Sequence, residues 1–393
     1  MTYGNMDVME RWGLSPVINA SGTMTSLGAS RVSPAVRAVV DDILGRFVRM
    51  DDLQAAASRV IAQATGSEAG YVTSSSSAAM TLACAAAITG NDMAAIEALP
   101  DTATPARIAV QAGHLINYGA PVGQAVRTSG AVVVPLGTAA LCDVWHLQAA
   151  IRSGLTAIVH VVSHHTVREG ELPLPLVAEI ATAHGIPVIL DMASEYDLTT
   201  PARLGITATI WSGHKFLGGT TSGIVAGQGP FIAAMLLQNR GLGRLMKAGK
   251  EAVVGAMAAL EQWGQRDHVA ARAAEDAIVA YWLARLADLP GVAATLHDDW
   301  TGNPITRVQL RMTPGASLHA WELADRCMAG APAVALRDDL AERQLIYLDP
   351  CNLTLPEAGI VADRIIQVLA DARAAGDGRG QDWADVKRAR GQW

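Results

Sequence analysis

Runs of β-branched residues alternate with alanine-rich stretches of helical length through the first two thirds of the chain. The apolar runs that we expect to form strands are 107–110, 131–136, 157–163, 187–191, 207–211 and 223–227. The stretches that we expect to form helices are 77–89, 117–129, 146–153, 174–184 and 230–239. Because strands that alternate with helices form βαβ units, the pattern predicts an α/β fold with a large, mostly parallel sheet covered on both faces.

The last third of the chain has a different pattern. A long helical region at 247–288 is rich in Ala, Glu, Arg and Leu, with a break expected near Gly264, and its length suggests a link between two domains. Strand-like and helical runs then follow one another up to residue 373, which predicts a smaller α+β domain. We therefore expect four parts, namely an N-terminal segment associated with the small domain (1–50), a large α/β domain (51–265), the small domain (266–375) and a polar tail (376–393).

Composition narrows the classes of function. The chain has 393 residues, of which 50% are apolar and 17% are charged, as is typical of a globular protein, and its net charge is -7. This acidic balance argues against a nucleic-acid-binding groove, since phosphate contacts need a basic face. The four cysteines form no CxxC pair, which predicts reduced thiols in a cytoplasmic protein and no zinc site. The N-terminal residues lack the apolar core of a signal peptide, and the alanine-rich windows are too short to span a membrane.

Three polar sites follow predicted strands, at the edge where parallel sheets bind ligands. The first is the run 74–77, which consists of four serines between a short apolar piece and an alanine-rich helix. Serines at a helix start cap free N–H groups, and the same groups with the helix dipole bind anions. One serine is enough for a cap, so four in a row favour a phosphate site, with plain capping as the alternative.

The second site is Asp191, at the end of the apolar run 187–191. A carboxylate at this position faces the ligand edge of the sheet and is shielded from water. It suits an acid that pairs with a ring nitrogen, while a helix cap or a salt-bridge partner is the alternative. Ala193 and Ser194 are small, so that a flat ring can lie above them.

The third site has the pattern S-x-H-K, with Ser212, His214 and Lys215 directly after the run 207–211 and several glycines beyond it. Lys215 follows Asp191 by 24 residues, the length of one helix and one strand, so we expect the two at neighbouring strand ends. Burying a lysine charge is costly, so a lysine after an apolar run is a solvated surface residue, an anion-binding residue or a covalent catalyst. An anion site, a ring-nitrogen acid and a lysine in one cleft together indicate pyridoxal 5′-phosphate (PLP), which forms a Schiff base with a lysine.

These motifs resemble the fold-type I PLP-dependent enzymes and, within them, the aminotransferase class V-like branch. More specifically, the chain is similar to the selenocysteine synthase-like and D-glucosaminate-6-phosphate ammonia-lyase-like group. The resemblance covers about residues 14–373 and is carried by VINASGTMTSLGASRVSPAV, TGSEAGYVTSSSSAA, HLINYGAPVGQ, IPVILDMAS, SGHKFLGG and GLGRLMKAGKE. The chain departs from the family pattern at 219–221, which read Gly-Thr-Thr instead of Gly-Pro-Gln, and at Ser75, which replaces a glycine of the phosphate loop.

The resemblance implies roles for these residues in the large, PLP-binding domain. Lys215 would form the Schiff base and then take the proton from the substrate Cα. Asp191 would pair with the pyridine nitrogen, and Ala193 would pack on the ring. The residues implied to bind the phosphate are Ser75, Ser76, Ser77, Ser212 and His214. His114 would stack on the cofactor, with a hydrogen-bonded loop residue as the alternative.

The resemblance also implies groups that bind the substrate. Arg244, Lys247 and Lys250 would lie by the active site, across a dimer interface, and bind an anionic group of the substrate or cofactor, with a solvated basic face as the alternative. Arg337, after a strand of the small domain, would bind a substrate carboxylate, because the arginine fork suits a carboxylate. Arg307 competes for that role.

The activity implied is that of a PLP-dependent lyase, which acts on a small amino acid or amino sugar acid through a Cα carbanion and eliminates ammonia. An amino acid racemase or epimerase is the first alternative, followed by a selenocysteine synthase-like transferase and a non-catalytic PLP-fold binding protein. The presence of both Lys215 and Asp191 disfavours the last, while the acidic charge and the few residues ahead of the matching core disfavour a tRNA substrate. We expect a homodimer or higher homo-oligomer with shared active sites, and no nucleic-acid or membrane partner.

Overall fold

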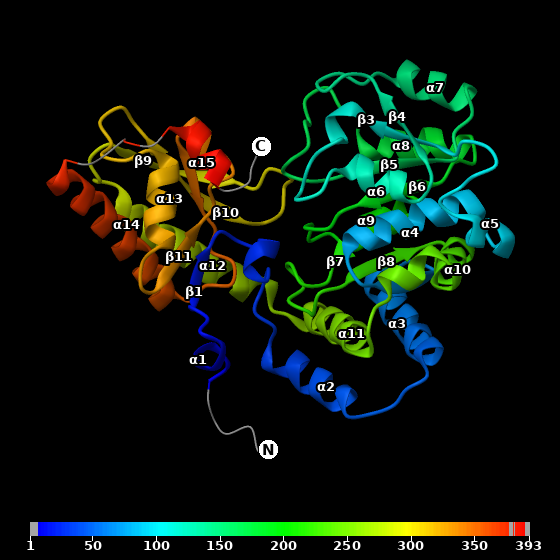
Figure 1. Cartoon of the computed structure of the whole chain (residues 1–393), viewed down its shortest axis with the longest axis horizontal. Coiled ribbons are helices and arrows are strands. Elements are labelled where there is room, and N and C mark those ends of the chain that lie inside the picture. Colours follow the sequence, from blue (N-terminus) through cyan, green and yellow to red (C-terminus); the bar gives the residue numbers. More distant parts are fainter. Residues whose placement is uncertain (1–6, 377–379, 381, 390–393) are drawn as a thin grey trace. The chain divides into compact units, whose positions relative to one another are not determined.

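The computed structural model describes residues 7–376, 380 and 382–389 (Figure 1). These residues form two compact units. The small unit is built from the described parts of 1–30 and 267–393, and the large unit is built from residues 31–266.

A seven-stranded sheet forms the centre of the large unit, in the order β2-β8-β7-β6-β5-β3-β4. Its strands are β2 (Ala69–Thr73), β3 (Arg107–Gln111), β4 (Val132–Leu136), β5 (Ala157–Val161), β6 (Val188–Asp191), β7 (Ala208–Ser212) and β8 (Gly223–Gly227). Neighbouring strands from β7 to β4 run parallel, while β8 runs antiparallel to both β2 and β7. The expected mostly parallel sheet is confirmed, and all five positions of β5 are buried, as in strands that are covered on both faces.

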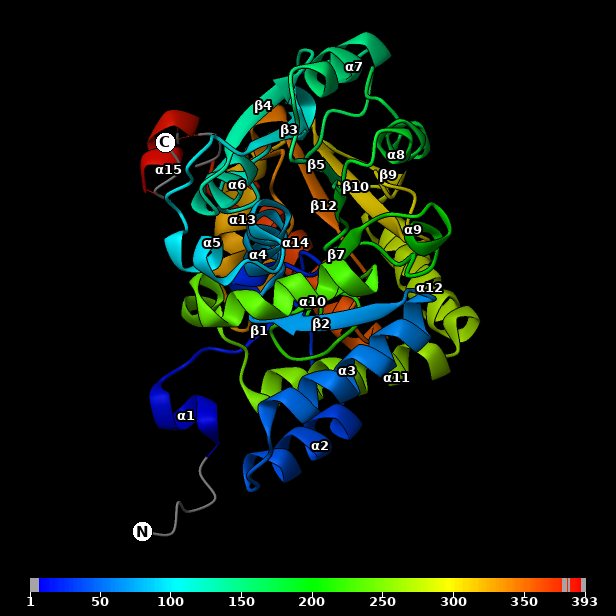
Figure 2. The ribbon, with the colours of Figure 1, turned by 90° about the vertical axis from the view of Figure 1, so that its right-hand side faces the viewer.

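Helices cover both faces of this sheet. The helices on one face are α4 (Ser76–Thr89), α6 (Val122–Thr128) and α10 (Gly229–Leu237). Those on the other face are α3 (Met50–Thr65), α7 (Val144–Arg152), α8 (Leu174–Ala183) and α11 (Lys250–Gln265). Figure 2 shows β2 between α10 on one side and α3 with α11 on the other. Two short helices, α5 (Met93–Ala98) and α9 (Thr200–Arg203), lie in the connections.

Residues 31–50 belong to the large unit, whereas we expected the whole segment 1–50 to go with the small one. They include α2 (Pro34–Leu44), which packs along α11 and places Val36 in the core of the large unit. The small unit keeps the residues before them, because β1 (Val17–Ala20) pairs there with β11 (Ala333–Leu336). The short helix α1 (Val8–Trp12) precedes β1.

The long helical region is divided into α11 and α12 (His268–Leu286). The break falls at Arg266 and Asp267, two residues beyond the expected Gly264. Asp267 ends the first helix and begins the second, because its side chain accepts a hydrogen bond from the Ala270 N–H at 2.9 Å, as an N-cap does. The boundary between the two units also falls here.

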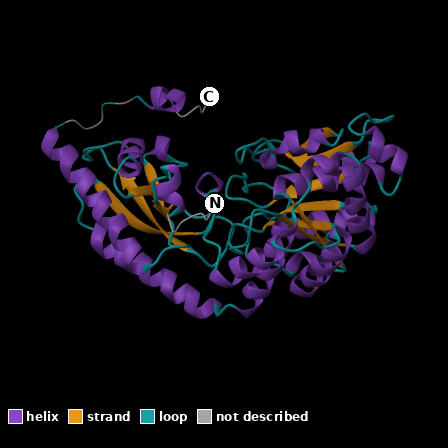
Figure 3. Cartoon of the chain, turned by 60° about the horizontal axis from the view of Figure 1, so that its bottom comes forward, coloured by secondary structure: helices purple, strands orange, loops and turns teal. Residues whose placement is uncertain are grey.

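The small unit has an antiparallel sheet in the order β12-β10-β9 and the separate pair β1-β11. The strands of the antiparallel sheet are β9 (Val292–Asp298), β10 (Thr306–Met312) and β12 (Leu345–Leu348). Its long helices, α12 and α14 (Leu355–Ala375), pack against each other, and α13 (Ala320–Met328) packs on α14. Figure 3 shows the helices of this unit in purple and its strands in orange. This is the α+β arrangement that the sequence predicts.

The tail contains one further helix, α15 (Trp383–Ala389), which our sequence analysis did not predict. Val386 is buried in the small unit's core, and the Gly380 N–H donates to Glu322 at 3.0 Å. The other positions of the predicted polar tail, 377–379, 381 and 390–393, lie outside the described residues. Within the described part of the chain, no helix has the length and apolar character needed to cross a membrane.

Candidate active site

Two neighbouring strands of the large unit end in the residues that carry the predicted chemistry. Asp191 is the last residue of β6 and pairs with Ile210 of β7, so the loop with Lys215 begins at the adjacent strand end. The Lys215 Nζ donates a hydrogen bond of 2.6 Å to the Ser194 hydroxyl, three residues after Asp191. The structure therefore brings the lysine and the loop after Asp191 together, as their spacing predicts.

Asp191 is a buried carboxyl group with an altered pKa. Asp191 is 8% exposed, and burial raises its pKa to about 6. The charge of Lys215 and the hydrogen bond from the Ala193 N–H act to lower this pKa. That N–H lies 3.1 Å from the carboxylate, while the Ala193 carbonyl accepts from the Ser212 N–H at 3.1 Å. A partner with a positive charge at this carboxylate would lower the free energy of its ionised form.

The serine run begins α4 at the same edge of the sheet. The Ser75 hydroxyl accepts from the Ala78 N–H at 3.1 Å and so caps the helix, and Ser76 is the first helical residue. Gly223 pairs with both Thr73 of β2 and Ser212 of β7. A Cβ at Gly223 would lie 2.3 Å from the Ser75 carbonyl oxygen, so only glycine allows this close approach. The serine loop and Ser212 thus flank one glycine, which supports a common anion site at the N-terminus of α4.

His214 also lies at this edge. Its Nδ1 is 3.3 Å from the Ser212 hydroxyl, and burial followed by the charge of Lys215 lowers its pKa. Its imidazole is therefore neutral at neutral pH, and a neutral ring can still donate one hydrogen bond.

His114 lies deeper than predicted. Its ring is 0% exposed, its Nδ1 accepts from the Val161 N–H at 3.2 Å, and its Nε2 lies 2.9 Å from Glu171. The enclosed ring presents no face to a cofactor, so the structure favours the hydrogen-bonded alternative over stacking. His160, whose ring contacts His114 edge to face at 4.6 Å, completes a His-His-Glu cluster. Because the Nδ1 of His114 accepts, its Nε2 carries the proton and is not available as a metal ligand.

Tyr118 is a site residue that our sequence analysis missed. Its hydroxyl lies 3.1 Å from the Ser77 hydroxyl. Its pKa is raised by burial and by the charge of Asp191, which the hydrogen bond with Ser77 partly offsets. Tyr118 therefore lies beside the serine run and within reach of the charge of the buried acid. The signal available in the sequence is the tyrosine of HLINYG, four residues after His114.

The basic residues of GLGRLMKAGKE do not form one cluster. Arg244, in the 3₁₀ turn Leu242–Met246, and Lys247 are exposed. Lys250 instead donates hydrogen bonds to the carbonyl oxygens of Leu44, at 2.9 Å, and of Arg46. Lys250 therefore holds the loop after α2, and of the three predicted residues only Arg244 and Lys247 present their side chains to solvent.

The departure from the family pattern after the lysine has a packing explanation. The Thr220 hydroxyl is 3.2 Å from the Ala252 carbonyl oxygen of α11. A Cβ at Gly255 would lie 2.2 Å from the same hydroxyl oxygen, so α11 approaches this loop closely. Thr220 thus attaches the lysine loop to a helix, while Thr221 is exposed.

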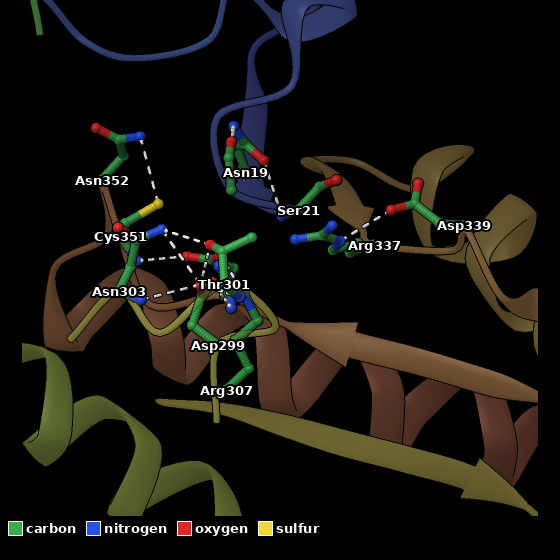
Figure 4. Close-up of polar contacts among 12 residues, drawn as sticks. Asn19, Ser21, Asp299, Thr301, Asn303, Arg307, Arg337, Asp339, Cys351 and Asn352 are labelled. Atoms are coloured by element: carbon green, nitrogen blue, oxygen red, sulfur yellow. Dashed lines mark hydrogen bonds and ion pairs between the residues drawn. The ribbon is translucent and has the colours of Figure 1, made fainter. Parts of the chain in front are cut away.

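The two arginines considered for the substrate carboxylate, Arg307 and Arg337, differ in their partners. Arg307 is 2% exposed, its Nε donates to Asp349 at 2.6 Å and its Nη1 to Asp299 at 2.7 Å. Arg337 donates through Nε to Asp339 at 2.9 Å, and its side chain is 7% exposed (Figure 4). Arg307 is already paired with two carboxylates, whereas Arg337 is paired with one, so Arg337 is the better candidate for a substrate carboxylate.

Comparison with known proteins shows the family to which the chain belongs. No protein-family model matches the chain. The chain is 32% identical over 368 residues to the D-glucosaminate-6-phosphate ammonia lyase of Salmonella typhimurium, covering 93% of this chain and 99% of that enzyme. The chain belongs to this enzyme's family. It is therefore a PLP-dependent enzyme of fold type I with aminotransferase class V-like and selenocysteine synthase-like relatives.

Other relatives of the chain differ in activity. The chain is 33% identical over 370 residues to a 5′-C-glycyluridine monooxygenase-decarboxylase of Streptomyces sp, covering 93% of each protein. It is 28% identical over 291 residues to the L-seryl-tRNA(Sec) selenium transferase of Serratia proteamaculans, covering 65% of this chain and 58% of that enzyme. Membership therefore establishes the cofactor more firmly than the substrate.

Solved structures agree with the fold. A structure of D-glucosaminate-6-phosphate ammonia-lyase superposes with a TM-score of 0.83 at 32% identity, covering 93% of this chain and 100% of that one. An alanine–glyoxylate aminotransferase from Nostoc sp. has a TM-score of 0.60 at 14% identity, covers 94% of this chain and 98% of that one, and shows the fold alone.

The residues present fit PLP. A lysine amine, an acid with a raised pKa and a serine-capped helix N-terminus lie at one sheet edge. When bound, the cofactor supplies an electron sink for the bonds at the substrate Cα. A protonated ring nitrogen beside Asp191 would supply the positive charge that burial of this carboxyl calls for.

Proposed function

We propose that the protein is a PLP-dependent ammonia lyase that acts on a small amino acid or amino sugar acid. The observation that carries this proposal is the Lys215 amine, held by Ser194 at the strand end next to the buried Asp191. The relative from Salmonella typhimurium, whose name states ammonia-lyase activity, supports the reaction class.

In this proposal Lys215 carries the covalent link to the cofactor and afterwards moves the proton at the substrate Cα. The Ser194 hydroxyl accepts from the amine at 2.6 Å and so sets its position. Asp191 holds a proton on the ring nitrogen, which keeps the ring electron-poor. Ala193 is small enough for the ring to pack above the loop between these groups.

We propose that the phosphate binds at the N-terminus of α4. Ser75, Ser76 and Ser77 offer hydroxyl and backbone N–H groups there, and Ser212 and His214 offer side chains from the neighbouring strand end. A helix N-terminus attracts a doubly charged phosphate through its free N–H groups and its dipole.

For the substrate, we propose that Arg337 binds the carboxylate. Its guanidinium is nearly buried, and its hydrogen bond to Asp339 uses Nε. Nη1 and Nη2 are the pair of nitrogens that a carboxylate engages in a two-point contact.

The direct test combines a spectrum with product analysis. Holoenzyme with PLP is given D-glucosaminate 6-phosphate with and without oxygen, and ammonia, keto acid, carbon dioxide and Cα-hydrogen exchange are measured. We expect release of ammonia without oxygen. Lys215→Ala should lose the visible absorption of the Schiff base and the activity, whereas Lys387→Ala, a surface control in the small unit, should lose neither. Cα-hydrogen exchange without keto acid would indicate a racemase, and oxygen-dependent carbon dioxide release would indicate a decarboxylase; either result would overturn the proposal.

We also propose a homodimer in the cytoplasm with active sites shared between subunits. The end of α2 and the loop after it expose the apolar side chains of Leu44, Phe47 and Val48, and Leu245 is exposed beside Arg244. Such side chains favour burial against a partner. All four cysteines are buried free thiols, which supports a reducing compartment.

Light scattering should give twice the chain mass, and Phe47→Asp should shift the protein toward monomer. If Arg244 and Lys247 act on the partner's site, mixing inactive Lys215→Ala with a weakened Arg244→Ala variant should restore part of the activity. A fully active monomer would contradict this proposal.

A further inference from the structure

Arg337 of the small unit lies on the face of an indole ring. Its guanidinium carbon is 4.5 Å from the centroid of the Trp300 ring. Such a cation–π contact constrains the plane of a guanidinium, because the flat group is most stable when stacked on the ring. The hydrogen bond from Nε to Asp339, at 2.9 Å, fixes one edge of the same group.

The other edge of the Arg337 guanidinium consists of Nη1 and Nη2. Among the described residues, the hydrogen bond of its guanidinium is the one to Asp339, so Nη1 and Nη2 remain available. Ser21 follows β1, and because Ala20 pairs with Leu336, it lies beside Arg337 (Figure 4). The pair of nitrogens and the hydroxyl together match the oxygen atoms of a carboxylate.

The position of Trp300 is itself fixed by the loop between β9 and β10. One carboxylate oxygen of Asp299, the preceding residue, accepts from the Thr301 N–H at 3.0 Å and from its hydroxyl at 2.7 Å. The same oxygen accepts from the Asn303 N–H and side-chain amide, both at 3.2 Å. A single side chain thus organises the whole turn.

This turn is attached to the interior of the small unit. The second oxygen of Asp299 accepts from Arg307 Nη1 at 2.7 Å, and the Nε of Arg307 donates to Asp349 at 2.6 Å. Arg307 also lies 5.1 Å from the Trp300 ring. A buried ion-pair network therefore extends from β12 through β10 to the indole.

We propose that Trp300 is a positioning residue for the substrate: it holds the Arg337 guanidinium so that Nη1, Nη2 and the Ser21 hydroxyl meet the substrate carboxylate. The inference rests on the proposed function for the role of Arg337 and adds Trp300, the Asp299 turn and Ser21 to it. Arg307, by comparison, is held by ion pairs with two carboxylates, through Nε and Nη1. In Arg337, Asp339 binds Nε and Trp300 packs on the face of the guanidinium. The group is therefore positioned before a ligand binds to its other two nitrogens.

The test measures binding to the PLP holoenzyme of 6-phosphogluconate, a sugar acid phosphate that lacks the amino group and cannot react. Calorimetry should give an affinity that falls about tenfold in Trp300→Leu. Trp300→Phe should fall less, because a smaller aromatic face remains. Trp321→Phe is the matched control, since this indole packs on His319 in the same unit, and its affinity should equal that of the wild type.

A second step separates positioning from general packing. Arg337→Lys removes the planar fork, so Trp300→Leu should cause no further loss of affinity in that background. An additive loss, an unchanged affinity in Trp300→Leu or no binding to the wild-type holoenzyme overturns the inference. Should Trp300→Leu fold poorly, the same comparison is made with Trp300→Phe. Binding coupled in this way without ammonia release would reject the proposed function alone, and ammonia release without the coupling would reject the inference alone.

Discussion

Two buried aspartates, one in each unit, experience opposite electrostatic environments. Asp191 ends β6 of the large unit and is 8% exposed, and Asp349 follows β12 of the small unit and is 1% exposed. Burial acts to raise both pKa values. For Asp349, the charge of Arg307 and the hydrogen bond from Cys351 bring the pKa below its usual value, whereas for Asp191 the pKa stays raised, at about 6.

The difference separates a group that supports the fold from one that awaits a ligand. Asp349 has an arginine at 2.6 Å within its own unit, so its charge is compensated when the chain folds. For Asp191 the charge of Lys215 acts to lower the pKa, but the hydrogen bond from the Lys215 amine goes to Ser194. An ionised Asp191 therefore lowers the stability of the folded protein without cofactor. A positively charged ring nitrogen would compensate this charge, and the free energy gained would contribute to the affinity for the cofactor.

The largest effect is expected for Arg307→Met, which leaves Asp299 and Asp349 buried without their cation. Removing one member of a buried ion-pair network typically costs about 3–5 kcal/mol. Denaturant unfolding of the protein should show this loss. Arg311→Met is the matched control, because Arg311 lies on the same strand and is exposed, and it should change the stability little. Equal effects of the two substitutions would show that the network does not stabilise the small unit.

A gain in stability, instead of a loss, is expected for Asp191→Asn in the protein without PLP. A carboxyl whose pKa rises from 3.8 to about 6 on folding destabilises the ionised native state by about 3 kcal/mol. The amide lacks this charge, so at pH 8 the variant should be more stable than the wild type by up to that amount. With PLP the order should reverse, since the amide cannot hold the proton on the ring nitrogen. A variant that is less stable in both conditions would contradict this assignment.

The difference in stability between the wild type and Asp191→Asn should also depend on pH. Because the folded pKa of Asp191 is raised, its favourable contribution is complete below about pH 4 and is lost as the pH rises through about 6. The excess stability of Asp191→Asn over the wild type should therefore grow across this window and then level off. Asp197→Asn is the control in the same loop. Hydrogen bonds from Thr199 and Thr200 bring the pKa of Asp197 below its usual value despite partial burial, so this substitution should lose stability above about pH 4.

Much of the large unit could be predicted from the sequence because its signals are local. Parallel strands buried on both faces are continuous apolar runs, and the residues that follow them meet at one edge, which explains why Asp191 and Lys215 were found together. Side-chain partners distant in sequence were not visible in this way. The ion pair of Arg307 with Asp349, the contact of His114 with Glu171 and the hydrogen bond by which Lys250 holds the end of α2 each depend on tertiary contacts.

The smallest effect on stability is expected for the loss of a helix cap, and each unit offers one. The Ser75 hydroxyl caps α4 at 3.1 Å, and the Thr354 hydroxyl caps α14 in the small unit, where it also bonds to Glu357 at 2.9 Å. Loss of either cap, in Ser75→Ala or Thr354→Ala, should cost about 1 kcal/mol of stability.

Only Ser75→Ala should in addition weaken PLP, because only that cap lies at the proposed phosphate site. Titration of each apoprotein with PLP, followed by its visible absorption, measures this difference. An unchanged PLP affinity in Ser75→Ala would reduce Ser75 to the plain capping role and leave phosphate binding to the helix N–H groups, Ser76 and Ser77. An equal loss of affinity in Thr354→Ala would show that the affinity follows overall stability rather than the local site, and the contrast between the two units would then not extend to their helix caps.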